Sequence, residues 1–219
     1  MKPLSTLAQS VRASTTMAID TQFKKMRAEG IDVIGFSVGE PDFPTPERIK
    51  QAGIRAIEAD QTKYTPTPGT LAVRQAVCQR LAEDWGLHYT TDEVVVTGGG
   101  KPVLYTALKA LVNPGDEVIL PAPYWVSYYE LIQMVGGTPV VVETTEENGF
   151  NLTPQQLRQA ITPKTKALIL NSPSNPTGMI YSRQHLEDLA QVCLEADLYV
   201  IADEMYSKLI FDGKEFVSF

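Results

Sequence analysis

Hydrophobic residues follow two alternating patterns in the second half of the chain, and this alternation predicts the fold. Short apolar runs of strand length occur at residues 93–97, 117–120, 139–143, 167–170 and 198–202. Between these runs, apolar positions recur every three or four residues, which is the spacing of a helix that buries one face. Strands that alternate with helices are typical of an α/β domain. We therefore predict a mostly parallel sheet with right-handed crossovers and helices on both faces.

Before residue 93 the pattern is less regular and predicts mostly helices. The predicted elements are helices at residues 5–29, 46–59 and 70–86 and one strand at residues 31–36. Thr45 and Pro46 suit a helix start, because a hydroxyl caps free N–H groups and proline fits the first turn. From the change of rhythm we expect residues 1–45 to form an N-terminal arm and part of a small domain. Residues 46–219 would form the large α/β domain.

Composition and charge narrow the class of protein. The chain has 219 residues, of which 43% are hydrophobic and 21% charged, an ordinary globular mixture with enough apolar side chains for a large core. The net charge of -7 argues against nucleic acid and membrane surfaces as partners, because both favour a basic face. No apolar run approaches the roughly 20 residues of a membrane span. Cys78 and Cys193 fall inside helical patterns, and two structural thiols fit a reducing cytoplasm.

A glycine run follows the first of the regular predicted strands. In parallel sheets, ligands bind just past the carboxyl ends of the strands. Gly98–Gly100 would open a helix there, and bare glycine amides at a helix N-terminus attract an anion such as phosphate. The run matches neither a P-loop nor the G-x-G-x-x-G dinucleotide motif, so an ordinary dinucleotide-binding domain is disfavoured. A plain tight turn remains the alternative.

Other predicted strand ends carry an aromatic ring, an amide and an acid. Trp125 would stack on a flat ring or lie in the core or at an interface, and Asn175 lies in a proline-rich loop. Asp203 directly follows a buried strand, where a carboxylate needs a cationic or hydrogen-bonded partner. Tyr206 would offer a phenol to the same crevice. Together with the glycine run, these residues favour a flat, phosphate-bearing ring with a protonated nitrogen, which describes pyridoxal 5′-phosphate.

Histidine and metal chemistry contribute little to this prediction. His88 lies in a predicted turn and His185 in the first turn of a predicted helix, and both are interpreted as incidental. We find no metal-ligand spacing in the sequence, so no metal is expected.

Six motifs in a fixed order resemble a known family. They are Gly39-Glu-Pro-Asp-Phe43, Lys63-Tyr64, Gly99-Gly-Lys101, Pro123-Tyr-Trp-Val-Ser127, Asn171-Ser-Pro-Ser-Asn-Pro-Thr-Gly178 and Asp203-Glu-Met-Tyr206. Over essentially its whole length the chain resembles a class I aminotransferase of the aspartate aminotransferase type, which has fold type I among pyridoxal-phosphate enzymes. It is most similar to the bacterial aspartate or aspartate/prephenate branch.

The resemblance implies roles around the cofactor. Asp203 would pair with the pyridinium nitrogen, and Tyr206 and Asn175 would hydrogen-bond the phenolic oxygen of the ring. Trp125 would stack over the ring and help to bind substrate. The phosphate loop would comprise Gly99, Gly100 and Lys101.

The resemblance also implies roles for substrate and subunit contacts. Lys101 and Asn175 would contact substrate, with Lys101 near its distal carboxylate, and Gly39 would present backbone to the α-carboxylate. Tyr64 would reach across a homodimer interface to the partner's phosphate, and residues 14–17 would lie near the mouth of the site. The peptide bonds Ala122-Pro123 and Asn175-Pro176 resemble two cis bonds of the family.

Two further functional residues of the family are expected beyond Phe219. Members continue from the Asp-x-x-Tyr motif to the Schiff-base lysine and later to the arginine that grips the α-carboxylate. Lys208 and Lys214 follow the motif too closely to replace this lysine and are interpreted as surface residues. We therefore expect the family function, transamination between aspartate or glutamate and a 2-oxo acid, with these 219 residues inactive alone. A non-catalytic fragment that binds pyridoxal phosphate or dimerises is the alternative.

Overall fold

The computed structural model of the chain describes residues 2–11, 15–36, 39, 41 and 43–219. The described residues form two compact units. One unit lies within Met1–Val11, Gln79–His88 and Thr97–Phe219, and the other within Arg12–Cys78 and Tyr89–Val96. No helix among the described residues is both long and apolar enough to cross a bilayer.

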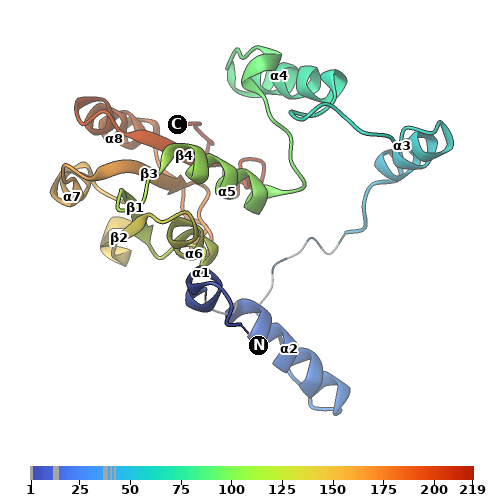
Figure 1. Cartoon of the computed structure of the whole chain (residues 1–219), viewed down its shortest axis with the longest axis horizontal. Helices are drawn as coiled ribbons and strands as arrows, with labels where there is room; N and C mark the ends of the chain where they lie inside the picture. The colour runs from blue at the N-terminus through green and yellow to red at the C-terminus, as the bar shows by residue number, and fades with distance from the viewer. Residues whose placement is uncertain (1, 12–14, 37–38, 40, 42) are drawn as a thin grey trace. The chain divides into compact units, whose positions relative to one another are not determined.

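The larger unit is built on a parallel sheet of four strands (Figure 1). The strands are β1 (Glu117–Ala122), β2 (Thr138–Glu143), β3 (Thr165–Asn171) and β4 (Tyr199–Asp203), and their order in the sheet is β2-β1-β3-β4. The registers pair Ala122 with Glu143 and Asn171 with Asp203. The strands therefore finish at one edge of the sheet, and the predicted α/β fold with a parallel sheet is confirmed.

Helices cover both faces of this sheet, and strand residues alternate between them. Helices α5 (Gly100–Leu111) and α6 (Ser127–Met134) share one apolar cluster with Val118, Leu120, Ala167 and Ile169. Helices α7 (Pro154–Ala160) and α8 (Arg183–Glu195) share the other with Ile119, Leu168 and Leu170. Side chains along a strand alternate between faces, so a sheet covered twice needs apolar residues at successive positions. This burial explains the unbroken apolar runs in the sequence.

The smaller unit is mostly helical. It contains α2 (Thr15–Ala28), α3 (Glu47–Glu58), the first half of α4 (Leu71–Trp85) and the 3-10 turn η1 (Thr91–Glu93). Arg74 ties α4 to its surroundings, because its guanidinium donates to the carbonyl oxygens of Thr91 at 2.6 Å and Gly69 at 3.3 Å. The remaining elements, α1 (Thr6–Ser10) and η2 (Glu146–Asn148), belong to the larger unit.

Several predicted elements of the first hundred residues were wrong. Residues 5–29 form two helices, α1 and α2, with residues 12–14 outside the described part. Residues 31–36 and 93–97 form no strand, and Val95 and Val96 are exposed. A β-strand exists only when a neighbour satisfies its backbone N–H and C=O groups, and no described segment forms a ladder with either run. Helix α3 has Pro46 rather than Thr45 at its N-cap, without a side-chain hydrogen bond.

Candidate active site at the carboxyl edge of the sheet

Asp203 is the last residue of β4 and is held by several hydrogen bonds. Its Oδ2 accepts a hydrogen bond from the Tyr128 hydroxyl at 2.7 Å, and its Oδ1 accepts one from the backbone N–H of Met205 at 3.2 Å. Its backbone oxygen accepts bonds from the Asn171 side-chain amide at 2.8 Å and from the Ser172 N–H at 3.1 Å. The half-buried carboxylate therefore points from the strand end with a defined orientation.

Tyr128 is the partner that the sequence did not identify. It lies in the first turn of α6 and is 2% exposed. Burial, followed by the neighbouring Asp203 carboxylate, raises the pKa of this phenol far above its ordinary value of 10.0. The hydroxyl therefore keeps its proton and acts as a permanent donor to Asp203.

The loop after β3 brings Asn175 to the same edge. The backbone N–H of Asn175 donates to the Asn171 Oδ1 at 2.7 Å, which holds the loop against the end of β3. The peptide bonds Ala122-Pro123 and Asn175-Pro176 are cis, as expected, and Ser172-Pro173 is cis as well. Asn171 thus bonds both Asn175 and Asp203, and links the two strand ends.

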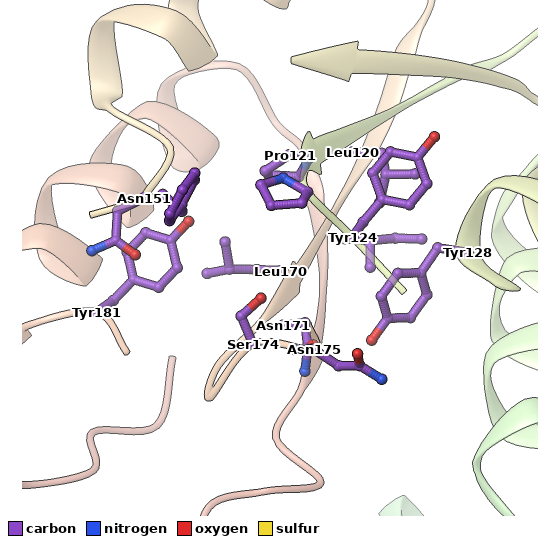
Figure 2. A pocket seen from close by; sticks show the side chains of 13 residues that line it. Leu120, Pro121, Tyr124, Tyr128, Asn151, Leu170, Asn171, Ser174, Asn175 and Tyr181 are labelled. Carbon is purple, nitrogen blue, oxygen red and sulfur yellow. The ribbon is translucent and has the colours of Figure 1, made fainter. Parts of the chain in front are cut away.

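A small cavity opens between the ends of β1 and β3 (Figure 2). Its volume is about 20 Å³, enough for one water molecule. Its polar lining includes Tyr124, Tyr128, Asn171, Ser174 and Asn175. Figure 2 shows the hydroxyl of Tyr128 and the side-chain amide of Asn175 directed toward the same space.

The glycine run forms an open helix N-terminus. Helix α5 begins at Gly100, and its N-cap residue Gly99 has a φ of +124°, which side chains with a Cβ rarely adopt. No side chain caps this helix, and a Cβ added at Gly98, Gly99 or Gly100 would meet no atom within 4 Å. The first N–H groups of α5 are therefore accessible to an anion.

A row of side chains connects this helix start to Asp203. The Lys101 ammonium lies 5.2 Å from the centre of the Trp125 ring, a cation–π distance. Trp125 contacts Tyr128 edge to face, with ring centres 5.4 Å apart, and Tyr128 bonds Asp203. The structure thus brings Lys101, Trp125 and Asp203 together within one unit.

Tyr206 lies just beyond β4 in a turn closed by the bond from the Leu209 N–H to the Tyr206 carbonyl oxygen at 2.8 Å. It is half-buried, and it is among the groups that raise the pKa of Tyr128, so it lies near the same edge. Lys208, a little further on, is exposed and pairs with Asp84 at 2.8 Å.

Two predicted site residues belong to the smaller unit. Gly39 and Tyr64 are both exposed. Their roles at a site shared with the larger unit stay predictions. Glu40, Asp42 and Ser14, which the resemblance also involved, lie outside the described residues.

Sequence reasoning missed Tyr128 and the bridging role of Asn171. Tyr128 follows Trp125 by three residues, and the Tyr128 N–H donates to the Trp125 carbonyl oxygen at 3.0 Å, so this single turn before α6 brings the two rings together. Asn171 ends an apolar strand next to the strand that carries Asp203. The sequence alone does not show that Asn171 and Asp203 are neighbours, because this requires knowing that their two strands pair.

Comparisons with known proteins define the family. Residues 31–219 match the family model described as "Aminotransferase class I and II", and the chain belongs to this family. It is 47% identical to an aspartate aminotransferase of Bacillus sp. (strain YM-2), over 98% of this chain and 55% of the relative.

Solved structures agree with this membership. A structure titled aspartate aminotransferase from Thermus thermophilus with maleate matches with a TM-score of 0.95 and 43% identity, over 99% of this chain and 56% of that one. An aspartate aminotransferase from Rhizobium meliloti matches with a TM-score of 0.95 and 38% identity, over 100% of this chain and 55% of that one. The chain spans about half the length of the relatives it matches.

Proposed function

We propose that this chain is the cofactor-binding part of a pyridoxal-phosphate-dependent aminotransferase, which moves an amino group between aspartate or glutamate and a 2-oxo acid. The observation that carries the proposal is the fixed Asp203 carboxylate at the end of β4. Side-chain contacts join it, through Tyr128 and Trp125, to the open N-terminus of α5. Membership of the aminotransferase family supports the same function.

The chemistry of these groups fits the three polar parts of pyridoxal 5′-phosphate. A carboxylate, Asp203, suits a positively charged ring nitrogen. The Tyr206 phenol and the Asn175 amide suit the ring oxygen, because both donate hydrogen bonds. Gly99, Gly100 and Lys101 suit the phosphate, since free helix N–H groups and an ammonium favour an anion.

Each residue has a separate task in the reaction. When bound, the cofactor supplies an electron sink for the electrons left when the substrate loses its α-proton. Asp203 would keep a proton on the ring nitrogen, which makes that sink effective. Tyr206 and Asn175 would orient the ring, and Trp125 would cover it and exclude water.

Substrate choice is assigned to Lys101 and its neighbours. Its exposed ammonium beside Trp125 would pair with the side-chain carboxylate of aspartate or glutamate. Gly39 would offer its backbone to the α-carboxylate, and Asn175 would also bind substrate. The neighbouring aromatic residues Tyr124 and Trp125 would also accommodate a larger ring. Prephenate and substrates with larger rings are therefore the alternatives.

We expect these 219 residues to bind cofactor without turning over. Transamination needs a lysine that holds the cofactor and moves the proton at the substrate α-carbon, and the resemblance assigns none of the present lysines to that task. Borohydride reduction followed by measurement of intact mass tests this expectation. Stoichiometric cofactor attached to one lysine would contradict it.

We propose that the longer enzyme forms a homodimer in which the two subunits share each active site. We also propose that it is cytoplasmic. Tyr64 is fully exposed, as expected of a phenol that contacts a partner's phosphate. Sedimentation shows whether the wild-type chain and the Tyr64→Ala variant are dimers, and cofactor titration compares their affinities. Equal cofactor affinity in a dimeric wild type and a dimeric variant would contradict the contact.

Titration of the whole chain tests the proposed function. Pyridoxal 5′-phosphate should bind and NAD should not, and Asp203→Asn should weaken cofactor binding by more than about tenfold, because an amide does not compensate a cationic ring. Asp188→Asn, the same change at an exposed position of α8, should leave the affinity unchanged. In a full-length enzyme Asp203→Ala should abolish activity. NAD binding without pyridoxal phosphate binding would overturn the proposal.

A further inference from the structure

We infer that Tyr128 is a positioning residue for Asp203: its phenol orients the carboxylate and sets how tightly the site keeps a proton on a bound ring nitrogen. The inference rests on the proposed function, because it concerns the cofactor that Asp203 would face. It assigns a function to the buried hydroxyl that donates to Asp203.

The geometry leaves the Tyr128 side chain little freedom. Its ring is buried in the apolar cluster that α5 and α6 form against the sheet, and the Trp125 ring edge packs on it. Only the hydroxyl reaches the polar edge, where it meets Asp203 Oδ2 at 2.7 Å. A buried hydroxyl with one strong acceptor has a fixed direction, so it fixes the acceptor as well.

Hydrogen bonds are the means by which this carboxylate is compensated. The Tyr128 hydroxyl donates a hydrogen bond to Oδ2, and the Met205 N–H donates one to Oδ1. Each oxygen keeps a second acceptor site. Asp203 takes part in no ion pair found among the described residues. The Asn171 amide bonds the Asp203 backbone oxygen instead, and the Tyr206 phenol lies near the same edge. Tyr128 is therefore one of two donors to the carboxylate.

The donor role of Tyr128 does not change with pH in the working range. Burial and the adjacent carboxylate raise the pKa of this phenol, so it remains protonated. A donor that stays protonated throughout this range withdraws charge from Oδ2 at every pH within it. Its removal should leave Asp203 a stronger base, and the ring nitrogen should then keep its proton to higher pH.

A cofactor analogue without an aldehyde tests the inference on the whole chain. The probe is 4-deoxypyridoxine 5′-phosphate, which has the ring nitrogen and phosphate but cannot react with lysines. The ultraviolet absorbance of the bound probe reports the protonation of its ring nitrogen. In Tyr128→Phe the pH midpoint of this change should rise by about one unit, the effect of one lost hydrogen bond to a charged group.

A matched variant and a stronger donor complete the test. Tyr129→Phe makes the same change one residue further along α6 and should leave the midpoint where the wild type has it. A 3-fluorotyrosine at position 128 is a stronger donor and should lower the midpoint, a reversal that loss of packing would not produce. This second substitution also keeps the test decisive if Tyr128→Phe does not fold.

The outcomes separate the inference from the proposed function. If the wild type and the position-128 variants bind the probe with the same midpoint, or the shifts have the opposite sign, the role of Tyr128 is overturned and the proposed function stands. If the wild type does not bind the probe at all, both are overturned.

Discussion

Single residues at the sheet edge depend on partners that are distant in the sequence. Asp203 was predicted as a functional acid because it directly follows an apolar strand. Its partner Tyr128 lies 75 residues away, and no local pattern links the two. Tyr181 is a similar case, because its buried hydroxyl accepts a hydrogen bond from the Leu152 N–H at 2.9 Å. Residue types were thus predictable, whereas pairs of residues were not.

Removal of the Tyr181 hydroxyl should destabilise the protein. Tyr181→Phe leaves the buried Leu152 N–H without its acceptor, at a cost of about 1–3 kcal/mol in the free energy of unfolding. Urea unfolding measures the change. Tyr199→Phe, which alters an exposed ring, is the control and should change stability little. Equal effects of the two variants would contradict the role of the buried bond.

The backbone conformation of Gly99, the N-cap residue of α5, should contribute to stability. Gly99→Ala forces a Cβ onto a residue with φ of +124°, which should cost roughly 1–3 kcal/mol of stability. Gly100→Ala places alanine in the first turn of a helix, where space is open, and should leave stability unchanged or slightly raised. Thermal unfolding compares the two variants. Similar losses in both would show that the conformation of Gly99 is not the cause.

Helices were predictable as elements because their signals are local. The start of α7 is an example: Thr153 Oγ1 accepts a hydrogen bond from the Gln156 N–H, and the Gln156 side chain accepts one from the Thr153 N–H. Strands needed more than their own sequence. Residues 93–97 have the composition of a strand, but their described surroundings offer no neighbour with which to form a ladder.

Loss of the α7 cap should be measurable. Thr153→Ala removes the acceptor for the Gln156 N–H and should lower the free energy of unfolding by about 1 kcal/mol. Thr145→Ala is the matched control, because Thr145 precedes η2 without a side-chain cap bond. Chemical denaturation of both variants decides the point, and a larger loss at Thr145 would refute the assignment.

The larger unit as a whole buries groups that would otherwise lose protons in alkali. Burial raises the pKa of the Cys193 thiol from 9.0 to about 11 and that of the Tyr181 phenol from 10.0 to about 12. The unfolded chain releases these protons at lower pH than the folded chain does. Stability from these groups is therefore complete below about pH 9 and declines as the pH rises toward 12.

Alkaline unfolding tests this dependence. The free energy of unfolding should fall from about pH 9 upward, and Cys193→Ala should flatten the part between pH 9 and 11. Cys78→Ala, which changes the half-buried cysteine of α4, is the matched control. A slope that is the same in the Cys193→Ala variant and the wild type would contradict the buried thiol as its source.

The sequence by itself determined the fold class, the strands of the sheet core, most helices and the residue types that stand at the strand ends. These features follow from hydrophobic period, capping residues and residue types at strand ends, all of which act over a few neighbouring positions. Only the tertiary structure decided that β3 and β4 lie side by side, that Asn171 bridges them, and that Tyr128 donates to Asp203. Such contacts depend on strand order and on which helix covers which face. They join positions tens of residues apart, and no local pattern contains that information.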